Sequence, residues 1–205
     1  MTKTFSVLST LFCVCLIASN LFETKIFDFC GITLTGGFLI FPISYILNDC
    51  LTEVYGYRKA RFAILTAFGM NAFLVLAAQL VRILPSAPFW QGQEHFDYIF
   101  AADLRITAAS MLAFLFGSIL NSIVMVRMKE RQGEKGFGWR AVASSLVGES
   151  VDSIVFFPIA FMGVGIRNIL VMMVTQIVLK TAYEVIVLPL TATCVKYLKR
   201  HDFAV

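Results

Sequence analysis

The sequence predicts an all-α fold, a polytopic membrane helix bundle with six transmembrane helices and both termini cytoplasmic, in a single domain over residues 1–205. The first observation is composition: 59% of the 205 residues are hydrophobic and only 15% are charged. The mean hydropathy of +0.81 is far above that of a water-soluble domain. The second is length, because apolar runs of about 20 residues, enough to cross a hydrocarbon core of about 30 Å, recur along almost the whole chain. The bilayer is therefore the expected solvent.

Six spans are expected in chain order, at residues 4–22, 36–55, 60–84, 106–126, 141–162 and 167–198. The first should remain as a helix, because it is long and lacks a small-residue cleavage site before the next polar segment. The last is longer than one crossing requires, so we expect it to tilt or to extend into the cytoplasm. The outer loop after the third span carries Trp90, Phe96 and Tyr98, which suit the membrane surface.

Lys and Arg residues are distributed unequally between the two sides of this arrangement. Twelve fall on one side: Lys3, Arg58, Lys59, Arg61, Arg127, Lys129, Arg131, Lys135, Arg140, Lys196, Lys199 and Arg200. Four fall on the other: Lys25, Arg82, Arg105 and Arg167. Because short cytoplasmic loops retain basic residues, both termini should be cytoplasmic. This asymmetry accounts for the net charge of +4, so no nucleic-acid partner is expected.

Small residues recur at four-residue spacing in the fourth and fifth spans, at Ala109, Ala113 and Gly117 and at Ala141 and Ser145. Such spacing lets the backbones of two membrane helices approach closely. We therefore expect these positions to serve tight helix packing.

Ionisable residues inside the spans are the strongest functional signal, because each costs about 2.5 to 3.5 kcal/mol at the centre of a membrane helix unless it is paired or wet. Three pairs occur: Asp49 with Glu53, Glu149 with Asp152, and Lys180 with Glu184. Spacings of three and four residues place each pair on one face of its own helix.

The same helix faces also carry aromatic, hydroxyl and amide groups. The resulting stripes are Phe41, Tyr45, Asp49 and Glu53 in the second span, Ser145, Glu149, Asp152 and Phe156 in the fifth, and Gln176, Lys180 and Glu184 in the sixth. The structural alternative is that these residues only tie helices together. For four carboxylates and one ammonium that alternative fails on charge balance, because three negative charges lack an internal partner unless they are protonated or meet a ligand. Glu53 is set apart, since Arg58 and Lys59 are close enough in sequence to pair with it.

A polar cavity with this inventory suits a flat, nitrogen-rich heterocycle. Carboxylates accept two adjacent N–H donors, aromatic rings stack on flat ligands, and amides or Lys donate to carbonyl oxygens. The edge of a guanine-like ring fits this set.

Three motifs resemble those of the bacterial queuosine precursor transporters of the vitamin uptake transporter group. They are FPISYILNDCLTEVYG at 41–56, VGESVDSIVFFP at 147–158, and KTAYE at 180–184 ahead of Pro189. The resemblance covers nearly the whole chain, including Asn20 and Lys25 near the end of the first span. It implies six membrane helices, import of 7-deazaguanine precursors of queuosine, a modified nucleoside of transfer RNA, and kinship with the substrate-binding subunits of energy-coupling-factor transporters.

With this resemblance, the stripes suggest roles for individual residues. A carboxylate among Glu149, Asp152 and Glu184 would accept the guanine-like edge, Lys180 or Gln176 would contact the carbonyl, and Phe41 or Tyr45 would stack on the ring. Asp49 could neutralise the cation of an aminomethyl precursor. Asn20, Lys25, Glu53 and Arg58 are expected to be gate or structural polar residues, with Glu53 sharing its charge with Arg58.

Two rival functions remain open at this point. An intramembrane hydrolase could use Asp49 and Asp152 as general acid and base. Only His95 and His201 are present, in a loop and the tail, so neither a buried Ser-His pair nor a His metal cluster is expected. The other rival carries a different flat heterocycle, such as a vitamin or a purine.

The expected partners are a small-molecule substrate and the lipid bilayer of the bacterial inner membrane, and no cofactor is expected. The chain has no G-x-x-x-x-G-K-[ST] phosphate loop. Energy would therefore come from an ion gradient, a separate energising module or metabolic trapping, and a homodimer is an open alternative for assembly.

Overall fold

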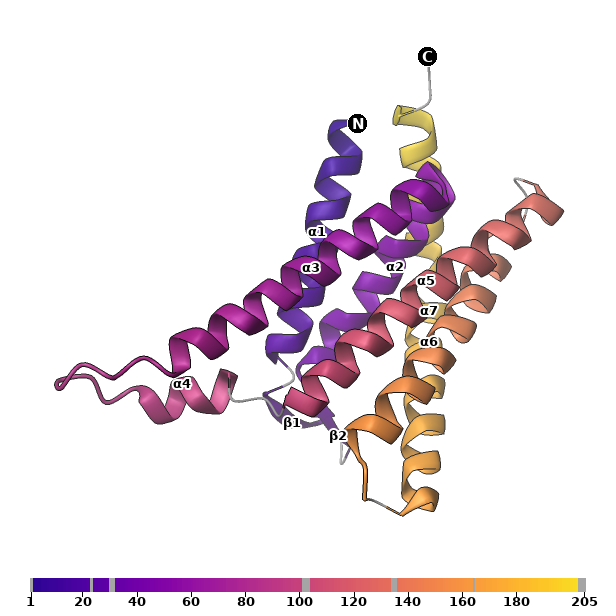
Figure 1. The fold of residues 1–205 in the computed structure, drawn as a ribbon. Helices are drawn as coiled ribbons and strands as arrows, with labels where there is room; N and C mark the ends of the chain where they lie inside the picture. The colour runs from indigo at the N-terminus through magenta and orange to yellow at the C-terminus, as the bar shows by residue number, and fades with distance from the viewer. Residues whose placement is uncertain are drawn as a thin grey trace.

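The computed structural model describes residues 2–22, 24–29, 32–100, 104–133, 136–163 and 165–202. The elements in order are α1 (Lys3–Phe22), β1 (Ile26–Phe29), β2 (Ile32–Thr35), α2 (Gly37–Tyr55), α3 (Tyr57–Arg82), α4 (Gln93–Phe100), α5 (Leu104–Gln132), α6 (Phe137–Ala160) and α7 (Ile166–Asp202). Figure 1 shows the long helices side by side, with the first turn of α1 and the last turn of α7 at the same end of the bundle.

Six of these helices, all except α4, are long and apolar enough to cross a membrane, which confirms the predicted multi-span helical bundle. Each overlaps one expected span, and the ends differ by a few residues. The largest extension is in α5, which continues to Gln132 where the sequence predicted an end near residue 126. The added turn carries Lys129, which contacts Glu53 of α2.

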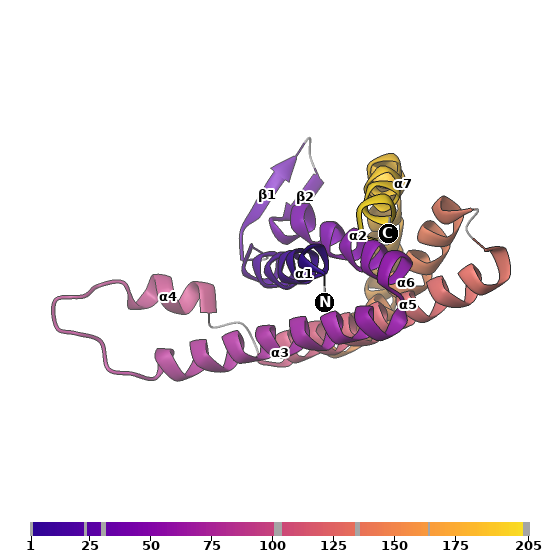
Figure 2. The same ribbon diagram turned by 90° about the horizontal axis from the view of Figure 1, so that it is seen from above.

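Three elements were not predicted, two strands and one short helix. Strands β1 and β2 form an antiparallel hairpin, with Ile26 opposite Thr35 and Phe29 opposite Ile32. The short helix α4 occupies part of the segment expected to be an outer loop, and it lies beside the end of α3, away from the rest of the bundle (Figure 2).

Helix α4 is held to α3 by polar contacts. Gln79 Nε2 donates to the carbonyl of Phe100 at 2.9 Å, and Arg82 Nε lies 3.0 Å from Asp97 Oδ1. Hydrogen bonds from Arg82 and Gln93 hold the pKa of Asp97 below its ordinary value. Because the Asp97 carboxylate is partly exposed, this contact orients a surface helix and adds little to overall stability.

Gly56 separates α2 from α3. Its φ of 82° lies in the left-handed region, which L side chains rarely adopt, so glycine permits the reversal here. The turn brings the basic start of α3 to the terminal end of the bundle, as Figure 1 shows.

The central helix is α2, which contacts α1, α3, α5 and α7 and is the most buried of the six candidate spans. Around it the apolar core includes Phe5, Phe12 and Leu16 of α1, whose burial removes large side chains from contact with the solvent. Phe12 packs against Phe114 of α5, with ring centroids 5.9 Å apart.

Large apolar side chains face outward along α3 and α7. Phe73 is 71% exposed and Ile186 is 77% exposed in the isolated chain. An outer surface of this kind would be insoluble in water but is what lipid tails contact. The pattern therefore agrees with a bilayer environment.

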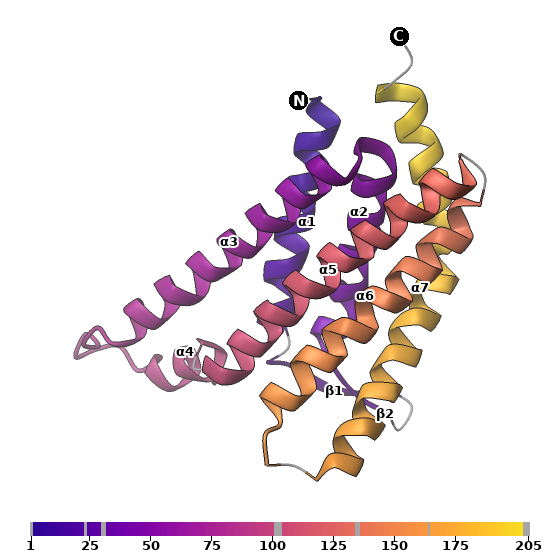
Figure 3. The same ribbon diagram turned by 45° about the vertical axis from the view of Figure 1, so that its right-hand side comes forward.

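Helices α5 and α6 cross closely, and the small residues explain how. A methyl group added at Gly117 would lie 2.8 Å from the carbonyl oxygen of Gly148, and one added at Gly148 would lie 2.9 Å from that of Gly117. Ala109, Ala113 and Ser145 are also fully buried. The predicted close packing is confirmed for Gly117, and the crossing brings α5 and α6 side by side next to α7 (Figure 3).

Candidate functional site

The structure gathers five of the predicted site residues into one buried group, hereafter the acidic cluster. Its members come from α2, α6 and α7: Asp49, Glu149, Asp152, Lys180 and Glu184. None is more than 8% exposed. Helix α2 therefore contributes to one closed polar site inside the bundle together with α6 and α7, which are distant from it in sequence.

Lys180 carries the only ammonium group of the acidic cluster, and this group forms an ion pair with Asp152. Lys180 Nζ lies 3.3 Å from Asp152 Oδ2, and both side chains are nearly inaccessible. The same ammonium lies 4.3 Å from the centroid of the Phe41 ring, within range of a cation–π contact. Lys180 thus links α7 to both α6 and α2.

Asp49 is held by donors that the sequence interpretation missed. Asn121 Nδ2 of α5 donates to Asp49 Oδ1 at 2.9 Å, and Ser145 Oγ of α6 donates to Oδ2 at 3.4 Å. Two polar residues in succession, Asn121 and Ser122, inside an apolar span were the signal that could have pointed to this partner. These hydrogen bonds favour the ionised form of the Asp49 carboxyl.

Glu149 and Glu184 differ in how they are supported. Thr181 Oγ1 donates to Glu149 Oε2 at 3.2 Å. Glu184 is 4% exposed, and neither of its carboxyl oxygens has a hydrogen-bond partner within ordinary geometry among the described residues. A buried carboxyl without a donor is costly when ionised, so Glu184 is the unsatisfied member of the acidic cluster.

Tyr45 lies against the acidic cluster from α2. Its hydroxyl would be 2.9 Å from a methyl group built on Gly117, and it has no hydrogen-bond partner among the described residues. Its ring centroid is 5.5 Å from that of Phe41. Phe41 and Gln176 are both half-buried, so they lie nearer the edge of the site than Tyr45 does.

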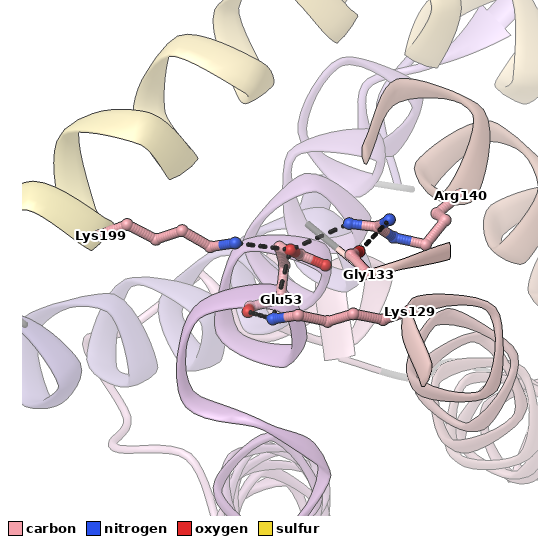
Figure 4. A network of polar contacts seen from close by, with 5 residues as sticks. All are labelled: Glu53, Lys129, Gly133, Arg140 and Lys199. Atoms are coloured by element: carbon pink, nitrogen blue, oxygen red, sulfur yellow. Dashed lines mark hydrogen bonds and ion pairs between the residues drawn. The ribbon is translucent and has the colours of Figure 1, made fainter. Parts of the chain in front are cut away.

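A second polar group, hereafter the Glu53 clamp, lies one helical turn from Asp49 towards the terminal end of the bundle. Figure 4 shows its residues: Glu53 of α2, Lys129 of α5, Arg140 of α6 and Lys199 of α7. Lys199 Nζ, Arg140 Nη2 and Lys129 Nζ lie 2.8, 3.1 and 3.3 Å from Glu53 Oε1. One carboxylate therefore joins four helices.

Backbone groups complete the Glu53 clamp. Lys129 Nζ donates to the carbonyl of Glu53 at 2.6 Å, and Arg140 Nη1 donates to that of Gly133 at 2.9 Å (Figure 4). A cavity of about 320 Å³ reaches Lys129, Thr52 and Tyr57 beside the clamp. Space for solvent is thus next to the clamp, whereas the acidic cluster is buried.

The prediction that Glu53 shares its charge with Arg58 was wrong. Arg58 is exposed, and the cations that contact Glu53 come from Lys129, Arg140 and Lys199, which lie 76, 87 and 146 residues further along the chain. The other two expected gate residues lie at the opposite end of the bundle. Asn20 Oδ1 accepts a hydrogen bond from Ser110 Oγ at 3.4 Å, and Lys25 is exposed.

Hydrogen bonds between α2 and α5 connect the two groups. Asn48 Nδ2 donates to the carbonyl of Ser118 at 3.3 Å, Ser122 Oγ donates to Asn48 Oδ1 at 3.2 Å, and the hydroxyls of Ser122 and Thr52 are 3.0 Å apart. The polar face of α2 is therefore continuous from Tyr45 to Glu53. Within the described ranges, no group of three or more His, Cys, Asp or Glu side chains is placed to hold a metal ion.

Comparison with known proteins gives a consistent result. Residues 35–194 match the family described as "Putative vitamin uptake transporter". A "Probable queuosine precursor transporter" of Bacillus subtilis is 26% identical over 175 residues, which are 84% of this chain and 76% of that protein. No solved structure matches the chain.

Two further relatives carry related names. A "Probable queuosine precursor transporter" of Haemophilus influenzae is 32% identical over 62% of this chain and 52% of its own length. A "Queuosine precursor transporter" of Escherichia coli is 30% identical over 64% of this chain and 57% of its own length. In these two, the matched region spans little more than half of the relative.

Proposed function

The chain belongs to the vitamin uptake transporter family, and on that premise we propose that it imports 7-deazaguanine precursors of queuosine, or queuine, across the bacterial inner membrane for transfer-RNA modification. Three relatives named as queuosine precursor transporters support this substrate class. The observation that carries the proposal is the acidic cluster, a set of buried carboxylates with aromatic neighbours in a membrane bundle.

The acidic cluster can recognise a guanine-like edge. Adjacent N–H donors on a flat ring pair with the two oxygens of one carboxylate. Glu149 is the proposed acceptor, because Thr181 fixes one of its oxygens and thereby orients the carboxylate. The closed site keeps water away from this carboxylate. The N–H groups of a bound ligand would supply the hydrogen bonds that water cannot.

Lys180 and the rings complete the proposed recognition. Lys180 would donate to the carbonyl oxygen of the ligand while remaining beside Asp152. The amide of Gln176, one turn away on α7, is the other proposed donor. The half-buried ring of Phe41, with Tyr45 behind it, offers a stacking surface. Asp49 would balance the cation of an aminomethyl precursor.

The Glu53 clamp is proposed to close the cytoplasmic side. It lies at the end of the bundle that carries both termini, and the excess of Lys and Arg at that end supports a cytoplasmic location. Because its ion pairs join α2, α5, α6 and α7, they must break or rearrange before a ligand at the acidic cluster can leave by that side. A homodimer, or a separate energising module, would add contacts outside the single chain.

Labelled uptake tests the proposal. Cells that depend on salvaged precursors and carry this chain should take up radiolabelled 7-aminomethyl-7-deazaguanine, and unlabelled queuine should compete. Glu149→Gln should lower uptake at least tenfold, because the amide nitrogen that replaces one carboxylate oxygen is a donor and cannot accept the second N–H of the ligand edge. Glu94→Gln, an exposed change on α4, is the matched control.

Labelled uptake also discriminates the alternatives. Uptake of a labelled purine or vitamin, with none of the labelled 7-deazaguanine, would replace the proposed substrate with another flat heterocycle. Unchanged uptake by the Glu149→Gln variant would remove Glu149 from the recognition site.

A further inference from the structure

We propose that Glu184 and Asp49 form a proton-binding site that couples import to the proton gradient, a role that rests on the proposed transport function. The two carboxyl groups are neighbours that interact across the contact between α7 and α2. The ligand of this site is a proton from the outer solution.

Glu184 is the member that would carry the proton. It lies 18 residues from each end of α7, and its side chain is 4% exposed. Asp49 and Ser145 lie beside it, yet neither of its carboxyl oxygens has a hydrogen-bond partner of ordinary geometry among the described residues. A carboxylate in that position has no donor to stabilise its charge, whereas the protonated acid needs none.

The surroundings reinforce this assignment. The groups that face Glu184 are Tyr45 and Asp49 from α2, Glu149 and Asp152 from α6, and Lys180 on its own helix. Lys180 is the only cation among them, and it is paired with Asp152 at 3.3 Å. With that pair neutral, ionised Asp49, Glu149 and Glu184 would leave three negative charges together, and one proton bound to Glu184 would remove one of them.

Asp49 is the member that would remain ionised. It accepts hydrogen bonds from Asn121 Nδ2 at 2.9 Å and Ser145 Oγ at 3.4 Å, which stabilise a carboxylate. A protonated Glu184 then gains a donor O–H that can be directed at Asp49. The O–H bond forms on Glu184 when the proton binds and breaks when it leaves, with no other reactant.

The proton would control the contact between α2 and α7. With one proton shared, the two acids attract, and α7 stays closed against α2. Without it, two carboxylates repel each other across the same interface, which favours separation of the helices that enclose the acidic cluster. Binding outside and release inside would therefore carry one proton inward with each substrate molecule.

The test uses the purified full-length chain in proteoliposomes, with the membrane potential held at zero by potassium and valinomycin. For the wild type, an inside-alkaline gradient should raise the accumulation of radiolabelled 7-aminomethyl-7-deazaguanine by about tenfold per pH unit for one coupled proton. Pyranine trapped inside should report acidification as the labelled base enters without an imposed gradient.

Two variants identify the site. For each variant, the accumulation of the labelled base is divided by that variant's own rate of equilibrium exchange of the same base. This normalisation removes the effect of a change in substrate affinity. Glu184→Gln and Asp49→Asn should each reduce the gradient response to about onefold, whereas Glu94→Gln and Glu130→Gln, both exposed, should keep the response of the wild type. Size-exclusion chromatography confirms that each variant is folded.

The outcomes separate the two proposals. The wild type could exchange the labelled base while its accumulation does not respond to the proton gradient and pyranine reports no acidification. That result would overturn the proton site and leave the proposed transport function in place. A gradient response in Glu184→Gln equal to that of the wild type would also overturn it. Absence of any exchange by the wild type would overturn the transport function and the proton site together.

Discussion

Lys180 balances one of four buried carboxylates in the acidic cluster, so its removal should be costly. Lys180→Met would leave Asp152 charged and unpaired at a position that is 6% exposed. We expect a loss of about 3 to 5 kcal/mol of stability, seen as a lower midpoint of thermal unfolding in detergent. The double variant Lys180→Met with Asp152→Asn should recover part of the loss, and a double variant no more stable than the single one would contradict the pairing.

Glu53 holds three cations with one carboxylate oxygen, and its neutralisation should loosen four helices at once. In Glu53→Gln, the fully buried Arg140 loses its ion pair with Glu53, while Lys129 and Lys199 are about 30% exposed and can turn to water. We expect a loss near the lower end of the range for a broken buried pair, about 3 kcal/mol. Thermal unfolding measures it, with Glu130→Gln as the control, and equal midpoints for the two variants would count against the clamp.

At this scale the sequence predicts which residues are important better than it predicts their partners. Helical spacing placed Asp49, Glu149, Asp152, Lys180 and Glu184 on polar faces, and all five meet. Spacing within one helix carries no information on which helix it will face, so Asn121, Arg140 and Lys199 were missed as partners. Arg58 was chosen for Glu53 because it is near in sequence, whereas the turn at Gly56 directs it outward.

The crossing of α5 and α6 depends on two glycines that touch through their backbones. Gly148→Ala would place a methyl group 2.9 Å from both Asn121 Cβ and the Gly117 carbonyl oxygen. Since the carbonyl belongs to a helix backbone, the helices must move apart, and we expect a cost of about 1 to 3 kcal/mol. Uptake should also fall, because Asn121 supports Asp49.

Gly69 in α3 provides the matched comparison. A methyl group there would meet nothing within 4 Å, so Gly69→Ala should be neutral or stabilising by about 0.5 to 1 kcal/mol through the better helix propensity of alanine. The midpoints of thermal unfolding of Gly69→Ala and Gly148→Ala, each compared with the wild type, test this difference. Equal effects at Gly69 and Gly148 would show that the crossing tolerates separation.

Long apolar helices were predictable as elements, whereas the short ones were not. The six spans are set by hydrophobic length alone. Helix α4 has eight residues, too few to be stable by itself, and it depends on Gln79 and Arg82 of α3. The hairpin left a sequence signal, two four-residue β-rich runs separated by Cys30 and Gly31, which lie outside the described residues.

For the whole molecule, the shared end of α1 and α7 makes topology testable. A reporter active only in the cytoplasm should be active when fused to either terminus, and single cysteines placed at Lys59 and Arg131 should be labelled only after the membrane is permeabilised. Cysteines at Pro88 and Arg167 should be labelled from outside. The reverse pattern would invert the bundle and place the Glu53 clamp on the outer side.

The distribution of acids and bases along the chain also bears on biosynthesis. Helix α2 is the least apolar of the six candidate spans, and it leaves the ribosome before any of the cations that contact Glu53. The last of them, Lys199, follows 146 residues later. Until α5, α6 and α7 are made, Asp49 and Glu53 carry the cost of acids in a lone membrane helix. Newly made α2 should therefore wait at the insertion machinery or at the lipid headgroups, and its final integration should occur only when translation is almost complete.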